Sequence, residues 1–413
     1  MIKKTHPKPN SGSDKKNAPK ISKRLIATAL ISFGLGAVVF WGGSQILSRT
    51  PIGKSQLDTS LLFKVESILR QKYNGDIDYQ KQSEGAAAGA VAALGDPYTV
   101  FLDKESNKEL SNDLKGELSG IGVEVGQKNN RLTIIAPFDG TPADAAGLRS
   151  GDIIIGINDE DTANLAVDQA VSKIRGEAGT KVKLTILRGN EPPKDFEITR
   201  ELINIPSVTS EMKDNNIGYI KIRRFGEDTS EQVKIAGNNL KAQGAKVIVL
   251  DVRDNPGGYL QSSVEVASEF YSDGVVVEER SRNSKPKIDS ALPGGTLTKL
   301  PVIVLINGGS ASASEILAGA LNDNDRATLV GEKTYGKGSV QEVICLNSLF
   351  LSSDCDGPSL KVTVANWFTP AGINISKEGI KPEVEVKLTS EDANAGRDPQ
   401  LQKALELAKQ ALN

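Results

Sequence analysis

Hydrophobic positions along the chain change their spacing several times, and each change predicts a different kind of segment. Residues 25–47 form an uncharged, mostly apolar run, and roughly 20 helical residues of this kind span a bilayer. Residues 58–73 and 83–94 instead show the spacing of ordinary helices. We therefore expect one transmembrane helix, followed by a small helical region over residues 48–104.

Residues 105–200 alternate between apolar and polar positions in short stretches that are separated by turns. Such a pattern is typical of half-buried strands. We expect strands at 121–125, 131–135, 151–158 and 180–187, and helices at 142–148 and 165–175.

Continuous aliphatic runs mark residues 201–388. Residues 246–252 and 301–306 are two such runs, and each precedes a glycine-rich loop and then a helix, at 259–271 and 314–322. Continuous apolar strands followed by helices indicate a parallel sheet that is buried on both faces. Sites in such sheets form beyond the carboxyl ends of the strands, where both glycine-rich loops fall. An amphipathic helix is expected in residues 389–413.

Charge is distributed unevenly along the chain. Residues 1–24 carry a net charge of +7, which leaves −9 for the rest of a chain whose total is −2. A disordered basic tail beside an acidic body argues against nucleic-acid binding and fits a membrane-topology signal. We expect a single-pass protein of the cell membrane, with residues 1–24 in the cytoplasm and the body outside. A cleaved secretory signal is the alternative, but its apolar core would be about 7–15 residues long.

The two cysteines, Cys345 and Cys355, bracket nine residues that suggest a hairpin. A disulfide between them would suit an oxidising compartment, and two free thiols are the alternative.

The candidate chemistry follows from a shortage of histidine. The only histidine, His6, lies in the basic tail, whereas residues 308–315 (GGSASASE) hold three alternating serines. A serine nucleophile in this chain must therefore use another base. Lys337 stands between two glycines downstream and is the candidate. Free lysine has a pKa near 10.4, so this role requires burial, which can lower the pKa by about 3–5 units.

Three motifs, at residues 251–258 (DVRDNPGG), 309–316 (GSASASEI) and 331–341 (GEKTYGKGSVQ), resemble those of the carboxyl-terminal processing peptidases. The resemblance runs from about residue 58 to the end of the chain. It implies a crotonase-like α/β protease core over residues 201–388, with an inserted PDZ domain over 105–200. Residues 119–123 and 142–148 carry the PDZ resemblance.

The resemblance implies Ser312 as nucleophile, Lys337 as general base and Gln341 as the residue that orients the lysine amine. The residues alone agree in part. Ser314 directly precedes Glu315 and is the expected N-cap, with its hydroxyl turned to the backbone, whereas Ser312 lies on the strand-to-helix turn, where its hydroxyl can point into a cleft. Ser310 needs only a turn role.

Acyl transfer also needs donors for an oxyanion. The N–H groups of Ala313 and of Gly257 or Gly258 are the candidates. In the PDZ domain, the loop Gly120, Ile121, Gly122 and Val123 would hold a terminal carboxylate, and the next strand edge would bind the peptide. A weaker hypothesis has Arg175 couple peptide binding to the core.

Other functions are less well supported. Residues 331–337 approach a phosphate-binding loop, but Gly338 replaces the Ser or Thr that would bind the metal. No nucleotide, metal or other cofactor is expected. We predict a membrane-anchored endopeptidase that acts on proteins with free carboxyl termini. The alternative is a silent PDZ scaffold, and an adaptor or an oligomeric state is left open.

Overall fold

The computed structural model describes residues 58–412, apart from 129–130, 139, 164, 166, 283, 348–354, 377, 390 and 393–394. The chain divides into two units, residues 1–79 and 80–413. The predicted basic tail, residues 1–24, lies outside the described residues.

The predicted transmembrane helix requires a correction. In the part of the chain that the structure describes, no helix is both long and apolar enough to cross a membrane. Residues 25–47, on which the prediction rested, lie outside that part. An apolar run gives hydropathy but does not by itself establish a helix. A single transmembrane helix is therefore not supported as part of the fold class, nor is the cell-membrane location that depended on it.

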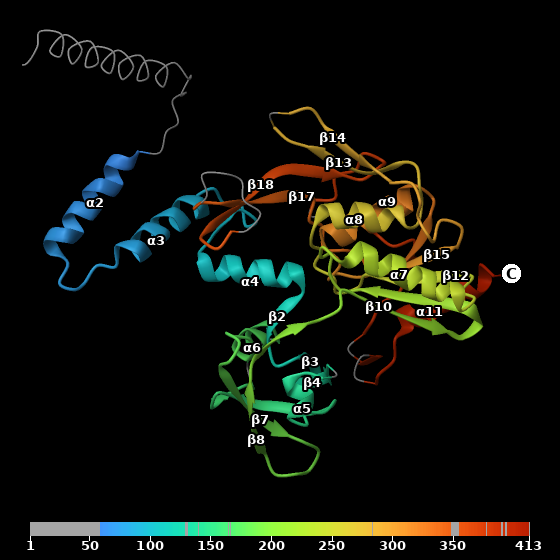
Figure 1. Ribbon diagram of the computed structural model, residues 1–413, viewed down its shortest axis with the longest axis horizontal. Coiled ribbons are helices and arrows are strands. Elements are labelled where there is room, and N and C mark those ends of the chain that lie inside the picture. Colours follow the sequence, from blue (N-terminus) through green and yellow to red (C-terminus); the bar gives the residue numbers. More distant parts are fainter. Residues whose placement is uncertain are drawn as a thin grey trace, which may run out of the picture. The chain divides into compact units, whose positions relative to one another are not determined.

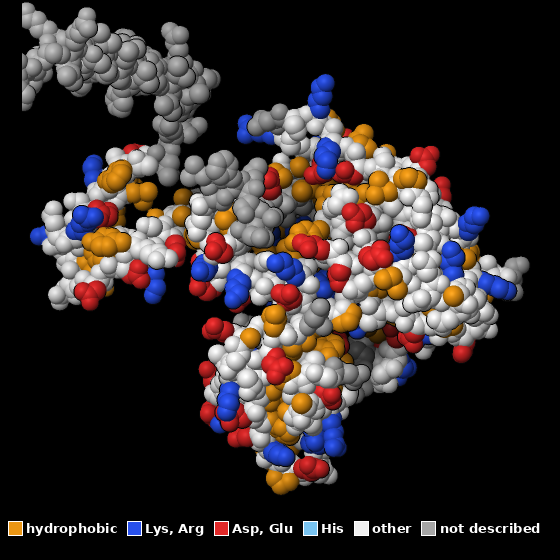
Figure 2. Space-filling view, viewed as in Figure 1, with side chains coloured by type: hydrophobic (Ala, Val, Ile, Leu, Met, Phe, Trp, Pro, Cys, Tyr) orange, Lys and Arg blue, Asp and Glu red, His pale blue; other side chains and the backbone are white. Residues whose placement is uncertain are grey.

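The described part of the first unit is a helix. α2 (Thr59–Lys72) begins at Asp58, whose carboxylate accepts from the N–H of Ser60 at 2.9 Å. None of its residues is buried. Apolar side chains are therefore exposed on its surface (Figure 2), among them Leu61, Phe63 and Ile68.

A helix that begins at the last residue of the first unit, a short strand and a second helix follow. These are α3 (Tyr79–Ala92), β1 (Val100–Leu102) and α4 (Lys104–Lys115). Gly116 ends α4 in the left-handed conformation, with φ at 78°. β2 (Glu117–Gly120) then pairs with β9 (Glu201–Asn204), so the chain enters and leaves residues 121–200 through one two-stranded ribbon.

Between β2 and β9 lies a strand-rich domain with its own apolar core, which includes Ile134, Ile157 and Leu184. Its strands form an antiparallel sheet in the order β3-β4-β5-β7-β8, with β6 paired to β5. The elements are β3 (Val123–Lys128), β4 (Arg131–Pro137), α5 (Pro142–Ala145), β5 (Ile153–Ile157), β6 (Glu160–Asp161), α6 (Val167–Ile174), β7 (Lys181–Leu187) and β8 (Lys194–Thr199).

The α/β core is built on a six-stranded sheet in the order β10-β11-β12-β15-β16-β19. Only β10 is antiparallel to its neighbour, and the other pairs are parallel. The strands are β10 (Val208–Lys213), β11 (Ile217–Ile222), β12 (Val247–Asp251), β15 (Val302–Ile306), β16 (Ala327–Gly331) and β19 (Val384–Glu385), and a 3₁₀ turn, η1 (Asp214–Asn216), joins the first two.

Side chains alternate along a strand, so each strand presents residues to both faces of this sheet. Both faces are covered. Ile248 and Leu250 face the core that contains α7 (Thr229–Ala242), α8 (Leu260–Ser268) and α9 (Ala313–Asp323), which Figure 1 shows gathered together. Val247 and Val249 face the opposite side, where α11 (Pro399–Gln410) packs through Ala404 and Ala408. The predicted buried parallel strands and their helices are confirmed.

A second sheet carries the Lys337 region. Its order is β1-β18-β13-β14, with β17 paired to β18. The additional strands are β13 (Val275–Arg280), β14 (Lys287–Ser290), β17 (Ser339–Cys345) and β18 (Ser359–Phe368).

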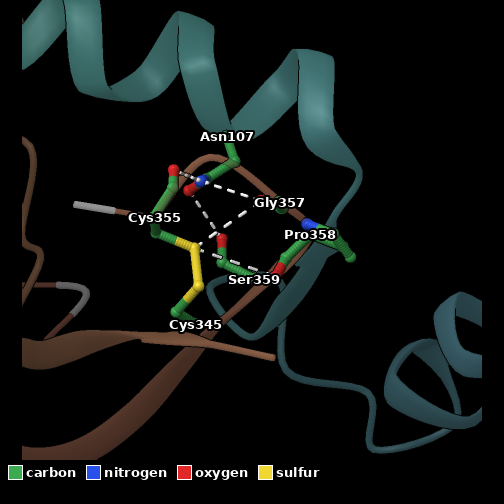
Figure 3. Close-up of a disulfide and its surroundings, with 6 residues drawn as sticks. All are labelled: Asn107, Cys345, Cys355, Gly357, Pro358 and Ser359. Carbon is green, nitrogen blue, oxygen red and sulfur yellow. Dashed lines mark hydrogen bonds between the residues drawn. A yellow bond between two sulfur atoms is a disulfide. The ribbon is translucent and has the colours of Figure 1, made fainter. Parts of the chain in front are cut away.

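A disulfide joins Cys345, the last residue of β17, to Cys355. Asn107 of α4 binds this turn (Figure 3): its amide nitrogen donates to the carbonyls of Cys355 at 2.9 Å and Gly357 at 3.0 Å. The hydroxyl of Ser359 donates to the Asn107 oxygen at 2.7 Å. The disulfide turn is thus held to α4 as well as to β17.

Candidate active site

Ser312 lies on a strained turn between β15 and α9. Its φ of 54° and ψ of −115° fall outside the regions that non-glycine residues favour. Such backbone conformations cost of the order of 1–3 kcal/mol and cluster at functional sites. A sharp strand-to-helix turn also projects a serine hydroxyl above the sheet. Ser312 is half-buried, whereas Ala311 and Ala313 on either side are buried.

The two flanking serines are buried and already bonded. The hydroxyl of Ser310 donates to the carbonyl of Val252 at 2.8 Å, and that of Ser314 donates to the carbonyl of Asn255 at 2.9 Å. The prediction that Ser314 caps the helix is wrong, because α9 begins at Ala313 and its N-cap is Ser312. Of the three serines, only Ser312 is partly exposed.

The second glycine-rich loop reaches the Ser312 turn through Gly257. A Cβ at this glycine would lie 2.8 Å from the Cβ of Ser312 and 3.0 Å from the nitrogen of Ala313. Its φ of 104° also disfavours any side chain. Only glycine therefore lets the two loops approach so closely.

The backbone donors beside Ser312 differ in their availability. The N–H of Gly257 donates to the side-chain oxygen of Asn255 at 2.9 Å. Within the described residues, the N–H groups of Gly258 and Ala313 have no hydrogen-bond partner. Of the two glycines left open by the sequence, Gly258 has the free donor.

Glu315 joins the serine loop to the lysine loop. It is fully buried, and one of its carboxylate oxygens accepts from the N–H of Ser312 at 2.9 Å and of Lys337 at 3.0 Å. The other accepts from the hydroxyl of Thr334 at 2.6 Å and the N–H of Gly336 at 2.7 Å. Four donors and the amino end of α9 offset the cost of burying this charge. One carboxylate therefore fixes the backbone at both Ser312 and Lys337.

Lys337 has the altered acidity that the chemistry requires. Burial, followed by the positive charge of Lys361, lowers the pKa of Lys337 to about 8, although the charge of Glu315 opposes the shift. Its carbonyl accepts from the indole nitrogen of Trp367 at 2.9 Å. Its amine lies 5.3 Å from the ring centroid of Tyr98.

Two predicted contacts are not formed. Within the part of the chain that the structure describes, the Ser312 hydroxyl and the Lys337 amine share no hydrogen bond. Gln341 does not bind Lys337 either, since its amide nitrogen donates to the hydroxyls of Ser339 at 2.9 Å and Thr363 at 3.3 Å. Catalytic hydrogen bonds are often long before substrate binds.

The predicted carboxylate loop lies between β2 and β3. Its Gly122 has a φ of 76°, and a Cβ there would lie 2.3 Å from the Cβ of Thr141. The carbonyls of Ile121 and Gly122 accept bonds from Ala143 and Phe138, at 2.7 and 2.9 Å. Among the described residues, the N–H groups of Ile121 and Gly122 have no partner. Val123 opens β3, which contacts α6.

Arg175 directly follows α6 and makes an exposed ion pair with Asp113 of α4, at 3.4 Å. It also lines a pocket of about 450 Å³ whose other walls include Phe138, Asp254 and Pro256. Asp254 and Pro256 belong to the loop of Gly257, so this pocket joins the strand-rich domain to the loop that approaches Ser312.

Sequence reasoning missed Glu315, Asn255 and Tyr98. A signal for Glu315 was available, because Ser312 and Glu315 have the spacing of a capping box, in which the glutamate binds the backbone of the first residue. No local pattern reveals that Tyr98 reaches Lys337. Among the described residues, no group of His, Cys, Asp and Glu could hold a metal ion.

Comparisons with known proteins identify the families of the chain's domains. Residues 216–386 match the family model of peptidase family S41, and residues 109–187 match that of the PDZ domain. Residues 47–106 match the N-terminal domain of the activating protease CtpB. The resemblance predicted from the motifs is confirmed.

Curated relatives agree over most of the chain. The carboxy-terminal processing protease CtpA of Bacillus subtilis is 35% identical over 88% of this chain and 76% of its own length. A carboxyl-terminal-processing protease of Synechocystis is 38% identical over 93% of this chain and 91% of its own.

Solved structures show the same fold. The photosystem II D1 C-terminal processing protease is 30% identical, with a TM-score of 0.51 over 79% of this chain and 86% of its own. An S41 protease from Bacteroides fragilis has a TM-score of 0.57 over 87% of this chain and 99% of its own, and at 19% identity it supports the fold alone. The chain belongs to peptidase family S41, as a serine-type carboxyl-terminal processing protease with a PDZ domain.

Proposed function

We propose that Ser312 and Lys337 cleave the peptide bond, and that the PDZ domain captures the free carboxyl end of the substrate protein. The observation that carries this proposal is the shared carboxylate of Glu315, which holds the backbone of Ser312, the one partly exposed serine of the three at 310–314, and of a lysine whose pKa is lowered. A base is most effective when its pKa lies near the working pH.

The reaction runs in two balanced halves. The neutral amine of Lys337 takes the proton of the Ser312 hydroxyl as its oxygen attacks the substrate carbonyl carbon. The resulting ammonium then protonates the leaving amine, and the bond between carbonyl carbon and nitrogen breaks. Lys337, neutral again, activates a water molecule that hydrolyses the ester and restores Ser312.

Negative charge develops on the carbonyl oxygen in both halves. The N–H groups of Ala313 and Gly258, which have no partner among the described residues, support an oxyanion site beside Ser312, and Ala313 also adds the positive end of the α9 dipole. Gly257 has the separate task of letting the loops meet. Gln341 would accept from Lys337 once substrate excludes water, because its side-chain oxygen is free among the described residues.

The PDZ domain would hold the end of the substrate. The N–H groups of Ile121 and Gly122 have no partner in the part of the chain that the structure describes, which suits a terminal carboxylate, and β3 beside α6 suits an added peptide strand. Arg175 is proposed to couple the two sites, since it lines the pocket that also contains Asp254 and Pro256. If Arg175→Ala leaves the rate and its dependence on the tail unchanged, this coupling is refuted.

The mechanism is tested by cleavage of an unstructured polypeptide with Ser312→Ala, Lys337→Ala and the unmodified chain. We expect both variants to fold and to lose cleavage. Full cleavage by either variant would refute the pair. If the unmodified chain folds but does not cleave the polypeptide, the result would favour a scaffold protein without activity.

A further inference from the structure

The side chain of Tyr98 lies against the proposed base, although it comes from outside the region that matches the peptidase family. Its ring centroid is 5.3 Å from the amine of Lys337. Tyr98 belongs to the residues that match the N-terminal domain model, 47–106, whereas the peptidase model covers 216–386. The immediate surroundings of Lys337 therefore include a residue that precedes the PDZ domain.

Tyr98 is held in place by its own turn. The carboxylate of Asp96 accepts from the N–H of Tyr98 at 3.0 Å and from the hydroxyl of Thr99 at 2.6 Å. The same Thr99 hydroxyl accepts from the N–H of Thr363 at 3.0 Å, which fastens the turn to β18.

Strand pairing continues this attachment. Val100 of β1 lies opposite Lys361 of β18, and β18 pairs in turn with β17, which follows the Lys337 loop. Trp367 of β18 holds the backbone of Lys337. Tyr98 therefore approaches the amine from a turn that is fixed to the same sheet.

The groups near the amine come from three segments. They are Glu315 of α9, Lys361 of β18 and Tyr98 itself, and Tyr335 of the lysine loop neighbours Tyr98. Glu315 favours the ammonium form, and Lys361 disfavours it. Burial and the neighbouring Tyr335 raise the pKa of Tyr98, so its phenol is neutral and adds no charge.

We propose that Tyr98 is a positioning residue that shields the Lys337 amine from water and so keeps it available as a base. This inference rests on the proposed role of Lys337. An aromatic ring can act on an amine in two opposite ways: it excludes water, which disfavours the ammonium, and its face attracts a cation. Burial is the largest cause of the lowered pKa of Lys337, and the ring of Tyr98 lies 5.3 Å from this amine, which favours shielding as the role of the ring.

Substitutions separate the two effects. Tyr98→Phe keeps the ring and loses only the hydroxyl, Tyr98→Leu keeps apolar bulk without an aromatic face, and Tyr98→Ala loses both. The measurement is kcat/KM against pH in the full chain, with an unstructured polypeptide as substrate. Tyr73→Ala is the control, because Tyr73 is an exposed tyrosine outside the unit that holds Lys337.

We expect Tyr98→Phe and Tyr73→Ala to keep the dependence of kcat/KM on pH seen in the unmodified chain. In Tyr98→Leu, the acidic limb, where kcat/KM rises with pH, should lie at the same pH as in the unmodified chain or lower. Tyr98→Ala should move that limb up by about one pH unit, with roughly tenfold lower kcat/KM near neutrality and recovery at high pH. Thermal unfolding of each variant checks the fold, and Tyr98→Val replaces Tyr98→Ala if the latter does not fold.

Two outcomes would overturn the inference. A Tyr98→Ala profile that coincides with the parent would show that the ring does not shield the amine. A limb that moves to lower pH would show that the ring acts by attracting the ammonium. Lys337→Ala, measured alongside, separates this failure from that of the mechanism: if it still cleaves, the base itself is misassigned.

Discussion

Ser310, Ser312 and Ser314 lie within five residues, but Ser312 differs from the other two in burial and in the hydrogen bonds of its hydroxyl. The hydroxyls of Ser310 and Ser314 tie the Ser312 turn to the carbonyls of Val252 and Asn255, and both serines are fully buried. Ser312 alone combines an accessible side chain with a positive φ. Residue type and spacing cannot distinguish these roles, because they depend on carbonyls about 58 residues away in the sequence.

This difference predicts that alanine substitutions at Ser310 and Ser314 lower stability, whereas the one at Ser312 lowers activity. Ser310→Ala and Ser314→Ala should lower the free energy of unfolding by about 1–3 kcal/mol each, since each leaves a buried carbonyl with a lost donor. Ser312→Ala should remove cleavage with little loss of stability. Denaturant unfolding and cleavage assays on the same preparations decide the matter. Equal destabilisation by all three would contradict the assignment.

Glu315 supports a second residue-scale prediction. In Glu315→Gln, one oxygen becomes an NH₂ group, which would face N–H donors that it cannot accept. We expect kcat to fall by about 10²-fold with little change in KM, because the Ser312 and Lys337 backbones lose their shared anchor.

A glutamate of the same core provides the control for this substitution. Glu332 accepts from Gln400 at 3.0 Å, away from Ser312, so Glu332→Gln should keep most of the activity. Unchanged kcat in Glu315→Gln would show that the carboxylate does not position the pair.

At the scale of elements, the contact between α4 and the disulfide turn is the attachment that local patterns did not reveal. Asn107 is buried and binds Cys355, Gly357 and Ser359 (Figure 3). These residues lie about 250 positions away in the sequence. Asn107→Ala and the double substitution Cys345→Ser, Cys355→Ser release the same turn from its two attachments.

We therefore expect these changes to be non-additive. Asn107→Ala should cost about 1–3 kcal/mol in the oxidised protein, through three lost bonds, and less when the disulfide is absent. A double-mutant cycle measured by denaturant unfolding tests this. Strict additivity would show that Asn107 and the disulfide stabilise the protein independently.

Sequence patterns predicted the elements well where burial is continuous. The run at 246–252 is β12 and that at 301–306 is β15, with α8 and α9 after them, because continuous aliphatic strands fit only a sheet covered on both faces. The apolar run at 25–47, by contrast, led to the prediction of a transmembrane helix, which is not supported. Hydropathy describes a segment alone, and the described helices of the chain do not support a membrane span.

At the scale of the whole molecule, function depends on whether the PDZ domain selects the substrate tail. A substrate whose terminal carboxylate is amidated should be processed with a KM about 10–100-fold higher, since charge-assisted bonds to free N–H groups contribute about 1.5–3 kcal/mol. Equal processing of free and amidated tails would refute capture.

Two glycines of the loop at residues 120–123 provide a matched pair of substitutions that also test capture of the substrate tail. A Cβ at Gly122 would collide with Thr141, whereas one at Gly120 has nothing within 4 Å. Gly122→Ala should therefore raise KM for the free tail and abolish the difference between tails, while Gly120→Ala should leave both unchanged. Binding of a short free-tail peptide to each full-length variant measures the capture step directly.

The roles of distant residues are what sequence alone could not supply at this scale. Motifs identified Ser312, Lys337 and Gln341 as candidates, and the spacing of a capping box signals the bond between Glu315 and Ser312. The contacts of Glu315 with segment 334–337 and of Tyr98 with Lys337 are non-local, so neither periodicity nor spacing encodes them.

The most direct test of the account is titration of the Lys337 amine by NMR, in full-length Ser312→Ala protein with isotope-labelled lysine. Lys337→Arg supplies the assignment of the signal. We predict a pKa of about 8 for this amine, well below the ordinary value of 10.5. A Lys337 signal that titrates near 10.5 would contradict the account, because the amine would then be protonated when it is needed as a base.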